Sequence, residues 1–239
     1  ILETAYLFDT LTVLGIMAQT PNECLEQSES VVNSSENISK PVKILDIYEP
    51  EQFLCTGESG FRFNRSGSIV IYTDGSCLSN GRSNPLAAIG VYFGPESPEN
   101  VSSRLASEYI PSNNTAEIVA VTTAFRLCKL HKLRDVEIRT DSKFLITCIT
   151  ELAGTWKLNG WRKTNGKPVV NAAELKELLD EACDLNVIWV HVQGHAHDEG
   201  NRCADFLARM ATINDFLQRQ DYELIDYKKL YYKNAFFNR

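Results

Sequence analysis

The sequence predicts an α/β fold in which a mixed five-stranded sheet, with three antiparallel strands and then parallel strands, is flanked by helices. Three observations support this prediction. Short runs rich in β-branched residues recur along the chain, the first three follow one another directly, and runs with helical spacing precede the last two. Consecutive strands favour antiparallel pairing, whereas strands separated by helices favour parallel crossovers. A hydrophobic content of 44% and a charged content of 23% exclude a collagen-like or wholly disordered chain.

The first three strands are bounded by turn residues. Residues 68–75 (SIVIYTDG) form a β-branched run that stops at an Asp-Gly pair, which is a turn signal. Residues 86–94 (LAAIGVYFG) and 102–110 (SSRLASEYI) are two further strand-like runs, and the Pro-, Gly- and Ser-rich residues between them predict a loop. We therefore expect an antiparallel meander in this part of the chain.

Helices alternate with strands in the second half of the chain. Residues 113–130 place small and apolar side chains at helical spacing after an Asn/Thr start, which predicts a helix. A strand that ends at an aspartate follows at residues 135–141. The remaining expected elements are helices at residues 142–152 and 172–183, a strand at residues 186–192 and a final helix at residues 201–212.

The sequence divides into a central domain at residues 66–213, a partly linker-like extension at residues 1–60 and an aromatic, basic tail at residues 214–239. Residues 1–60 carry ten Asp and Glu against two Lys, so this segment accounts for most of the net charge of −7. The acidity therefore does not exclude a nucleic-acid partner for the central domain, in which residues 156–167 carry four basic residues and no acid. No apolar run is long enough for a membrane-spanning helix.

Two predicted strands end in similar sequence motifs, at Asp74 in TDGS and at Asp141 in TDSK. A single aspartate there is often a turn former, but two on neighbouring strands would place carboxylates side by side. A divalent cation usually relieves such repulsion. Glu117 lies in the first turn of the helix expected at residues 113–130, and Asp205 lies one turn into the last helix. Helix dipoles could explain each of these two acids alone, but they do not explain the order of all four along the chain.

The motifs around these acids resemble type 1 ribonuclease H. YTDGS, SNNTAE, RTDSK and VHVQGHAHDEGNRCAD occur in the order of that family, over about residues 66–212. The basic, Trp-bearing segment at residues 156–167 makes the chain similar to the cellular eukaryotic and bacterial members rather than to retroviral domains. The resemblance implies the ribonuclease H-like fold and a catalytic domain at residues 66–213.

The resemblance also implies which residues form the site. The family's four metal-binding, catalytic carboxylates match Asp74, Glu117, Asp141 and Asp205, and its mobile active-site histidine matches His195. Positions that contact the RNA strand match Asn80, Asn113 and Asn114, and a position that helps to hold a DNA phosphate matches Asn171. The DNA strand is expected to lie along Trp156, Lys157, Trp161, Arg162 and Lys163.

Two positions depart from the family pattern. Ile110 stands seven residues before Glu117, where vertebrate-like members carry an arginine for the DNA phosphate. Leu152 stands where many members have a tryptophan in the DNA-binding channel. Both departures concern DNA-strand affinity and leave the catalytic carboxylates unchanged.

The resemblance implies an endonuclease that hydrolyses the RNA strand of RNA–DNA hybrids without sequence specificity. It would use two Mg²⁺ ions, for which Mn²⁺ is expected to substitute. Two alternatives stay open: a catalytically silent hybrid-binding module, and the ribonuclease H domain of a retroelement polyprotein. The seven cysteines are odd in number and show no close pairs, which favours reduced thiols and an intracellular protein. The opening residues lack the arginines of a transit peptide, so we expect the nucleus or cytoplasm rather than the mitochondrion. No protein partner is predicted.

Overall fold

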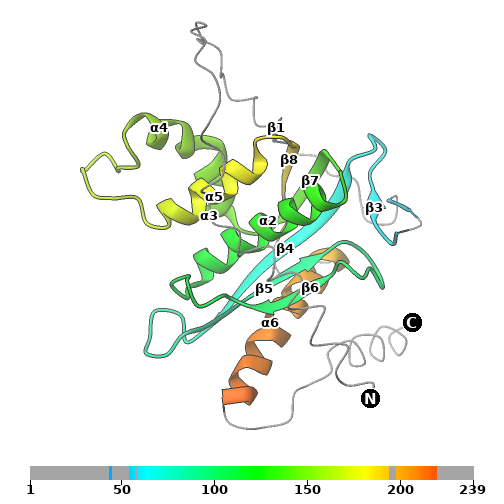
Figure 1. The fold of residues 1–239 in the computed structure, drawn as a ribbon, viewed down its shortest axis with the longest axis horizontal. Coiled ribbons are helices and arrows are strands. Elements are labelled where there is room, and N and C mark those ends of the chain that lie inside the picture. The colour runs from blue at the N-terminus through cyan, green and yellow to red at the C-terminus, as the bar shows by residue number, and fades with distance from the viewer. Residues whose placement is uncertain (1–42, 45–53, 58, 194–197, 220–239) are drawn as a thin grey trace, which may run out of the picture. The chain divides into compact units, whose positions relative to one another are not determined.

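A computed structural model describes residues 43–44, 54–57, 59–193 and 198–219, all within one compact unit of residues 41–239 (Figure 1). Residues 1–42 of the predicted extension, and residues 220–239 of the predicted tail, lie outside the described residues. Among the helices that are described, none has the length and apolar content needed to cross a lipid bilayer.

One eight-stranded sheet forms the centre of the unit. Its strands are β1 (Lys43–Ile44), β2 (Cys55–Thr56), β3 (Arg62–Phe63), β4 (Ile69–Leu78), β5 (Leu86–Tyr92), β6 (Val101–Arg104), β7 (Asp135–Thr140) and β8 (Asn186–His191). The prediction of five strands was wrong in number, because β1, β2 and β3 were missed. Each contains two residues, which is too short to produce a recognisable alternation of apolar and polar residues. β1 and β2 come from the predicted acidic extension, so part of that segment joins the sheet.

The five longer strands pair around β4. β4 is antiparallel to β5, and β5 is antiparallel to β6. On its other side β4 is parallel to β7, and β7 is parallel to β8. β7 ends at Thr140, directly before Asp141, whereas β4 continues past Asp74 to Leu78, so the prediction that the first strand ends at Asp74 was wrong. Because the two strands are parallel and Tyr72 is the register partner of Arg139, Asp74 and Asp141 lie at the same level of the sheet.

The helices are α2 (Asn113–Leu130), α3 (Lys143–Thr147), α4 (Ala153–Leu158), α5 (Ala172–Ala182) and α6 (Glu199–Arg219), with the π-helical turn η3 (Cys148–Leu152) between α3 and α4. The bounds predicted for α2 are confirmed. Its start is fixed by Ser112, whose side chain accepts a hydrogen bond from the backbone N–H of Thr115. α6 continues for seven residues beyond its predicted end at residue 212, and thus occupies the first part of the predicted tail.

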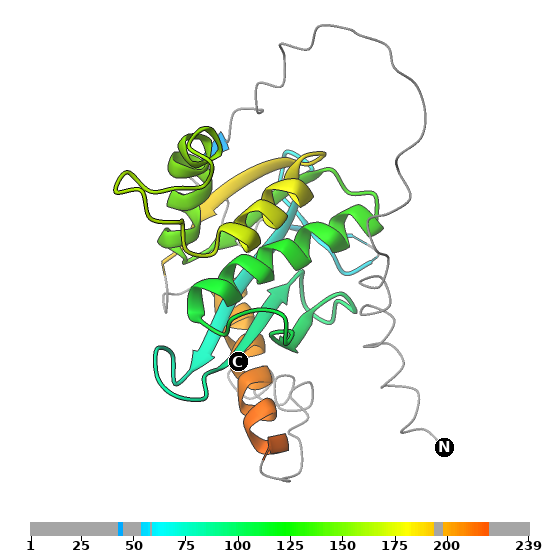
Figure 2. The ribbon, with the colours of Figure 1, turned by 60° about the vertical axis from the view of Figure 1, so that its left-hand side comes forward.

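The helices cover the two faces of the sheet unequally (Figures 1 and 2). α2 and α5 pack together over one face, and α6 packs on the other, against β4, β5 and β6. β4 supplies both interfaces by alternation, since Ile69 and Ile71 join the larger core cluster while Val70 and Tyr72 pack with α6. β4 is buried from Ile69 to Gly75, and it packs against both α2 and α6.

Candidate metal and catalytic site

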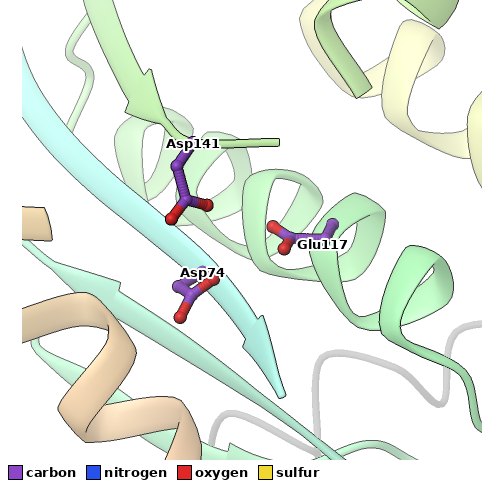
Figure 3. A group of neighbouring side chains, drawn as sticks. All are labelled: Asp74, Glu117 and Asp141. Atoms are coloured by element: carbon purple, nitrogen blue, oxygen red, sulfur yellow. The ribbon is translucent and has the colours of Figure 1, made fainter. Parts of the chain in front are cut away.

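Three of the predicted metal ligands meet where β7 ends beside β4. Asp74 comes from β4, Glu117 from α2 and Asp141 from the residue directly after β7, and Figure 3 shows their carboxylates around a common point. One oxygen from each of the three lies within 4.8 Å of the others. Side chains from three separate elements, far apart in the sequence, therefore form one carboxylate cluster, which we call the acidic triad.

The position of Glu117 depends on a close approach between β4 and α2. Gly75 follows Asp74 in β4, and a Cβ atom at Gly75 would lie 2.5 Å from the backbone nitrogen of Glu117. Only a residue without a side chain permits this contact. Glu117 is the fifth residue of α2, so it lies just beyond the first turn, in which it was predicted. The side chain of Glu117 is buried at 4% exposure. The interaction of a surface carboxylate with the helix dipole therefore does not explain why a glutamate occupies this position.

The acidic triad is electrostatically unfavourable without a cation. Burial, together with the charges of Asp141 and Asp205, raises the pKa of Asp74 from 3.8 to about 8. Burial also raises the pKa of Glu117 well above its usual range, with added repulsion from Asp74 and Asp141. Nothing that is described in the protein forms a hydrogen bond with the buried Oε2 of Glu117. An oxygen-only set with an unused buried acceptor fits a hard divalent cation.

Asp205, the fourth predicted carboxylate, lies near the triad without belonging to it. It is on α6, and its charge acts on the pKa of Asp74. Its Oδ2 is 3.4 Å from Nη1 of Arg209, one helical turn further along α6. The predicted active-site histidine, His195, lies outside the described residues, so the structure does not test its placement.

The asparagines predicted to contact nucleic acid lie near the start of α2. The backbone N–H of Asn113 donates to Oδ1 of Asn80, at 3.3 Å, which joins the β4–β5 loop to the helix; Asn114 is exposed beside them. Asn171 precedes α5 with a φ of 60°, a left-handed conformation that asparagine tolerates. Its Nδ2 donates to Oγ1 of Thr115, at 2.9 Å. The starts of α2 and α5 are therefore connected through side chains.

The predicted DNA-strand segment combines anchored rings with exposed cations. The rings of Trp156 and Trp161 are 6.2 Å apart and half-buried against the larger core cluster. Lys157, Arg162 and Lys163 are exposed around them. The tryptophans therefore hold the segment on the domain and leave the three cations at its surface, where Arg162 also donates to the carbonyl of Gly166.

The two departures from the family pattern lie on the surface. The side chain of Ile110 is 78% exposed, directly before the start of α2, and that of Leu152 is 36% exposed at the end of η3. The exposed side chain of Ile110 therefore has little apolar packing to lose.

Asn201 is a site residue that the sequence did not reveal. It lies within the GNRCAD motif, but an asparagine near the start of a helix is common and carries no specific signal. In the structure it is buried, and its Nδ2 donates to Oδ2 of Asp141 at 3.3 Å.

Comparisons with known proteins agree with this geometry. The sequence model of the family described as RNase H matches residues 66–213. Ribonuclease H1 of Rattus norvegicus is 42% identical over 142 residues, which cover 59% of this chain and 49% of the relative. Ribonuclease H of Rickettsia felis is 39% identical over 140 residues, which cover 59% of this chain and 88% of the relative. The chain thus spans about half the length of the first of these relatives and most of the second.

Among solved structures, the foamy viral protease–reverse transcriptase in complex with an RNA/DNA hybrid is similar, with a TM-score of 0.50 and 20% sequence identity. The match covers 84% of this chain and 26% of the viral chain. At this identity the likeness shows a shared fold.

Proposed function

Because the chain belongs to the ribonuclease H family, we propose that it is a metal-dependent endonuclease that hydrolyses the RNA strand of RNA–DNA hybrids without sequence specificity. The observation that carries the proposal is the acidic triad, in which three carboxylates from separate elements converge within 4.8 Å. The mutual repulsion of these carboxylates lowers the stability of a protein that binds no cation. A phosphodiester substrate is itself anionic, so it too requires a cation between it and the carboxylates.

Asp74, Glu117 and Asp141 would hold Mg²⁺, and Asp205 would contribute to a second site from α6. When bound, two such ions activate a water and stabilise the leaving oxygen in an in-line displacement at phosphorus. The chain's own contribution is to fix the ligands: β4 and β7 hold the two aspartates in parallel register, and the contact at Gly75 brings Glu117 to them. Mn²⁺, which accepts the same oxygen ligands, is expected to substitute.

Recognition of the hybrid would use two groups of side chains. The amides of Asn80, Asn113 and Asn114 can both donate and accept hydrogen bonds, as a test for the 2′-hydroxyl of RNA requires. The exposed cations Lys157, Arg162 and Lys163 would bind phosphates of the DNA strand, beside the half-buried rings of Trp156 and Trp161. Backbone contacts of this kind carry no base information, so the cleavage is sequence-nonspecific.

The test is cleavage of one labelled sequence as RNA–DNA, RNA–RNA and DNA–DNA duplexes, in Mg²⁺, Mn²⁺ and EDTA. We expect metal-dependent cutting of the RNA strand in the hybrid alone. Asp74→Asn should abolish turnover and keep hybrid binding, because it removes a carboxylate charge and leaves the binding residues untouched. If the wild-type protein binds the hybrid without cutting it in either metal, the catalytically silent module replaces this proposal.

A further inference from the structure

Asn201 connects two parts of the proposed site that come from different elements. It is the third residue of α6, its side chain is only 3% exposed, and its Nδ2 donates to Oδ2 of Asp141 at 3.3 Å. Asp141 is the first residue after β7. The bond is thus a direct contact between the first turn of α6 and the carboxyl end of β7.

The first turn of α6 is held in place independently of that bond. The backbone N–H of Asn201 donates to Oδ1 of Asp198 at 3.1 Å. Gly200 packs on the ring of Tyr72, where a Cβ atom would lie only 2.2 Å from Cε2. The hydroxyl of Tyr72 in turn accepts a hydrogen bond from the fully buried Arg139, at 2.7 Å. Since this support is rigid, the Asn201 amide acts from a fixed position.

Asn201 and Asp205 are four residues apart on one helix, so their side chains lie on the same face of α6. A bond from Asn201 to Asp141 therefore also sets the separation between Asp141 and Asp205. In addition, Oδ1 of Asn201 is buried without a hydrogen-bond partner in the described part of the chain. A water molecule in the site would be a suitable donor to it.

We propose that Asn201 is a positioning residue, which orients Asp141 and fixes the spacing between Asp141 and Asp205 for metal binding. This inference rests on the proposed function, because it assigns both aspartates to metal. Groups that hydrogen-bond to a metal-binding carboxylate fix its orientation before the cation arrives, and their removal typically costs about 10–100-fold in metal affinity or activity. Asn201 itself touches neither substrate nor metal in this role.

The test compares wild type with Asn201→Leu, which keeps a similar side-chain size and removes the donor, and with Asn201→Ala as a second variant. Thr212→Val is the matched control, since Thr212 is a buried polar residue of the same helix whose hydroxyl donates to the backbone carbonyl of Ala208. Mn²⁺ binding is measured by calorimetry without nucleic acid, and folding is checked by thermal unfolding.

We expect both Asn201 variants to bind Mn²⁺ at least about tenfold more weakly and to need more metal for turnover, with KM for the hybrid unchanged. Thr212→Val should match wild type. Unchanged Mn²⁺ affinity in a folded Asn201 variant would overturn the inference, as would an equal loss in Thr212→Val. Failure of the proposed function is a separate result: wild type would then bind Mn²⁺ and leave hybrids intact, and the calorimetric comparison would still decide the role of Asn201.

Discussion

Tyr72 of β4 and Arg139 of β7 are register partners in two parallel strands. Asp74 and Asp141 each follow two residues later, so the pairing carries both carboxylates to the same level of the sheet, where β7 ends and β4 continues. The repulsion in the acidic triad is therefore imposed by strand register. The fold maintains it at a cost in stability that depends on pH and on bound cations.

The stability of the metal-free protein should fall as the pH rises from about 4 to about 8. The pKa of Asp74 is raised from 3.8 to about 8 in the folded state, so the folded protein binds protons more tightly than the unfolded chain across this range. The resulting stabilisation is complete at pH values below the unfolded-state pKa of 3.8 and is lost at pH values above the folded-state pKa of about 8. Urea unfolding in EDTA should give a lower free energy of unfolding at pH 8 than at pH 5. Asp74→Asn should reduce this difference, and an equal slope in wild type and variant would contradict the assignment.

Mg²⁺ should stabilise the protein more at pH 8 than at pH 5. A cation binds the ionised carboxylates, which are abundant only at the higher pH. A ligand that binds the native state stabilises it more the more tightly it binds, with the logarithm of its concentration over Kd. Thermal unfolding with and without Mg²⁺ at the two pH values measures this. Asp74→Asn should lose most of the shift at pH 8. A shift of the same size at both pH values would indicate that Mg²⁺ acts elsewhere on the protein.

The sequence predicted those parts of the fold that have a clear period or a clear boundary. The helix at Asn113–Leu130 has small and apolar residues on a regular spacing, and β7 and β8 are β-branched runs of ordinary length. The strands β1 and β2 could not be predicted, because two residues carry no period and their pairing depends on the finished sheet. The end of α6 was missed for another reason: residues 213–219 lack the strong stop signal that a glycine or proline would give.

The candidate site was predictable where a motif supplied it. The acidic triad consists of residues that the resemblance identified, and the structure adds their convergence. Three features required coordinates: the burial of Glu117, the pairing of Asp205 with Arg209, and the bond from Asn201 to Asp141. Each depends on how α2 or α6 packs against the sheet, which no local sequence pattern specifies.

Gly75→Ala should damage both stability and activity. The added Cβ atom would meet backbone atoms of α2, 2.5 Å from the nitrogen of Glu117, and neither backbone segment can move aside cheaply. We expect a loss of roughly 1–3 kcal/mol in the free energy of unfolding. Displacement of Glu117 by about 1 Å would lower kcat by roughly 100-fold. The matched control is Gly154→Ala in α4, where a Cβ atom would contact nothing within 4 Å; equal behaviour of the two variants would contradict the steric argument.

Replacing Lys157, Arg162 or Lys163 by alanine should weaken hybrid binding without changing kcat. These exposed cations lie in the Trp-bearing segment outside the acidic triad, so their loss removes phosphate contacts and leaves the chemistry intact. Each substitution should lower the slope of log affinity against log salt by about 1. Fluorescence anisotropy with a labelled hybrid over a salt series measures the slope. Arg134→Ala is the control and should leave the slope unchanged. Arg134 is an exposed cation directly before β7, at the end of that strand far from Asp141.

Ile110→Arg should tighten hybrid binding. The side chain is 78% exposed beside the start of α2, so an arginine can replace it without disturbing the core, and its guanidinium would lie near the joined starts of α2 and α5. An added charge-assisted contact to a DNA phosphate is worth about 1 kcal/mol at such a surface, which corresponds to roughly fivefold in affinity.

Two controls separate a specific phosphate contact from a general effect of charge. Leu130→Arg adds the same charge at a 62% exposed position at the far end of α2, a helix about 27 Å long at 1.5 Å per residue. Ile110→Gln adds polarity without charge. If Ile110→Arg alone raises affinity, and does so through KM with kcat unchanged, the DNA strand passes the start of α2. If both arginine variants raise affinity equally, the gain comes from the overall charge, and the DNA strand takes another course across the domain.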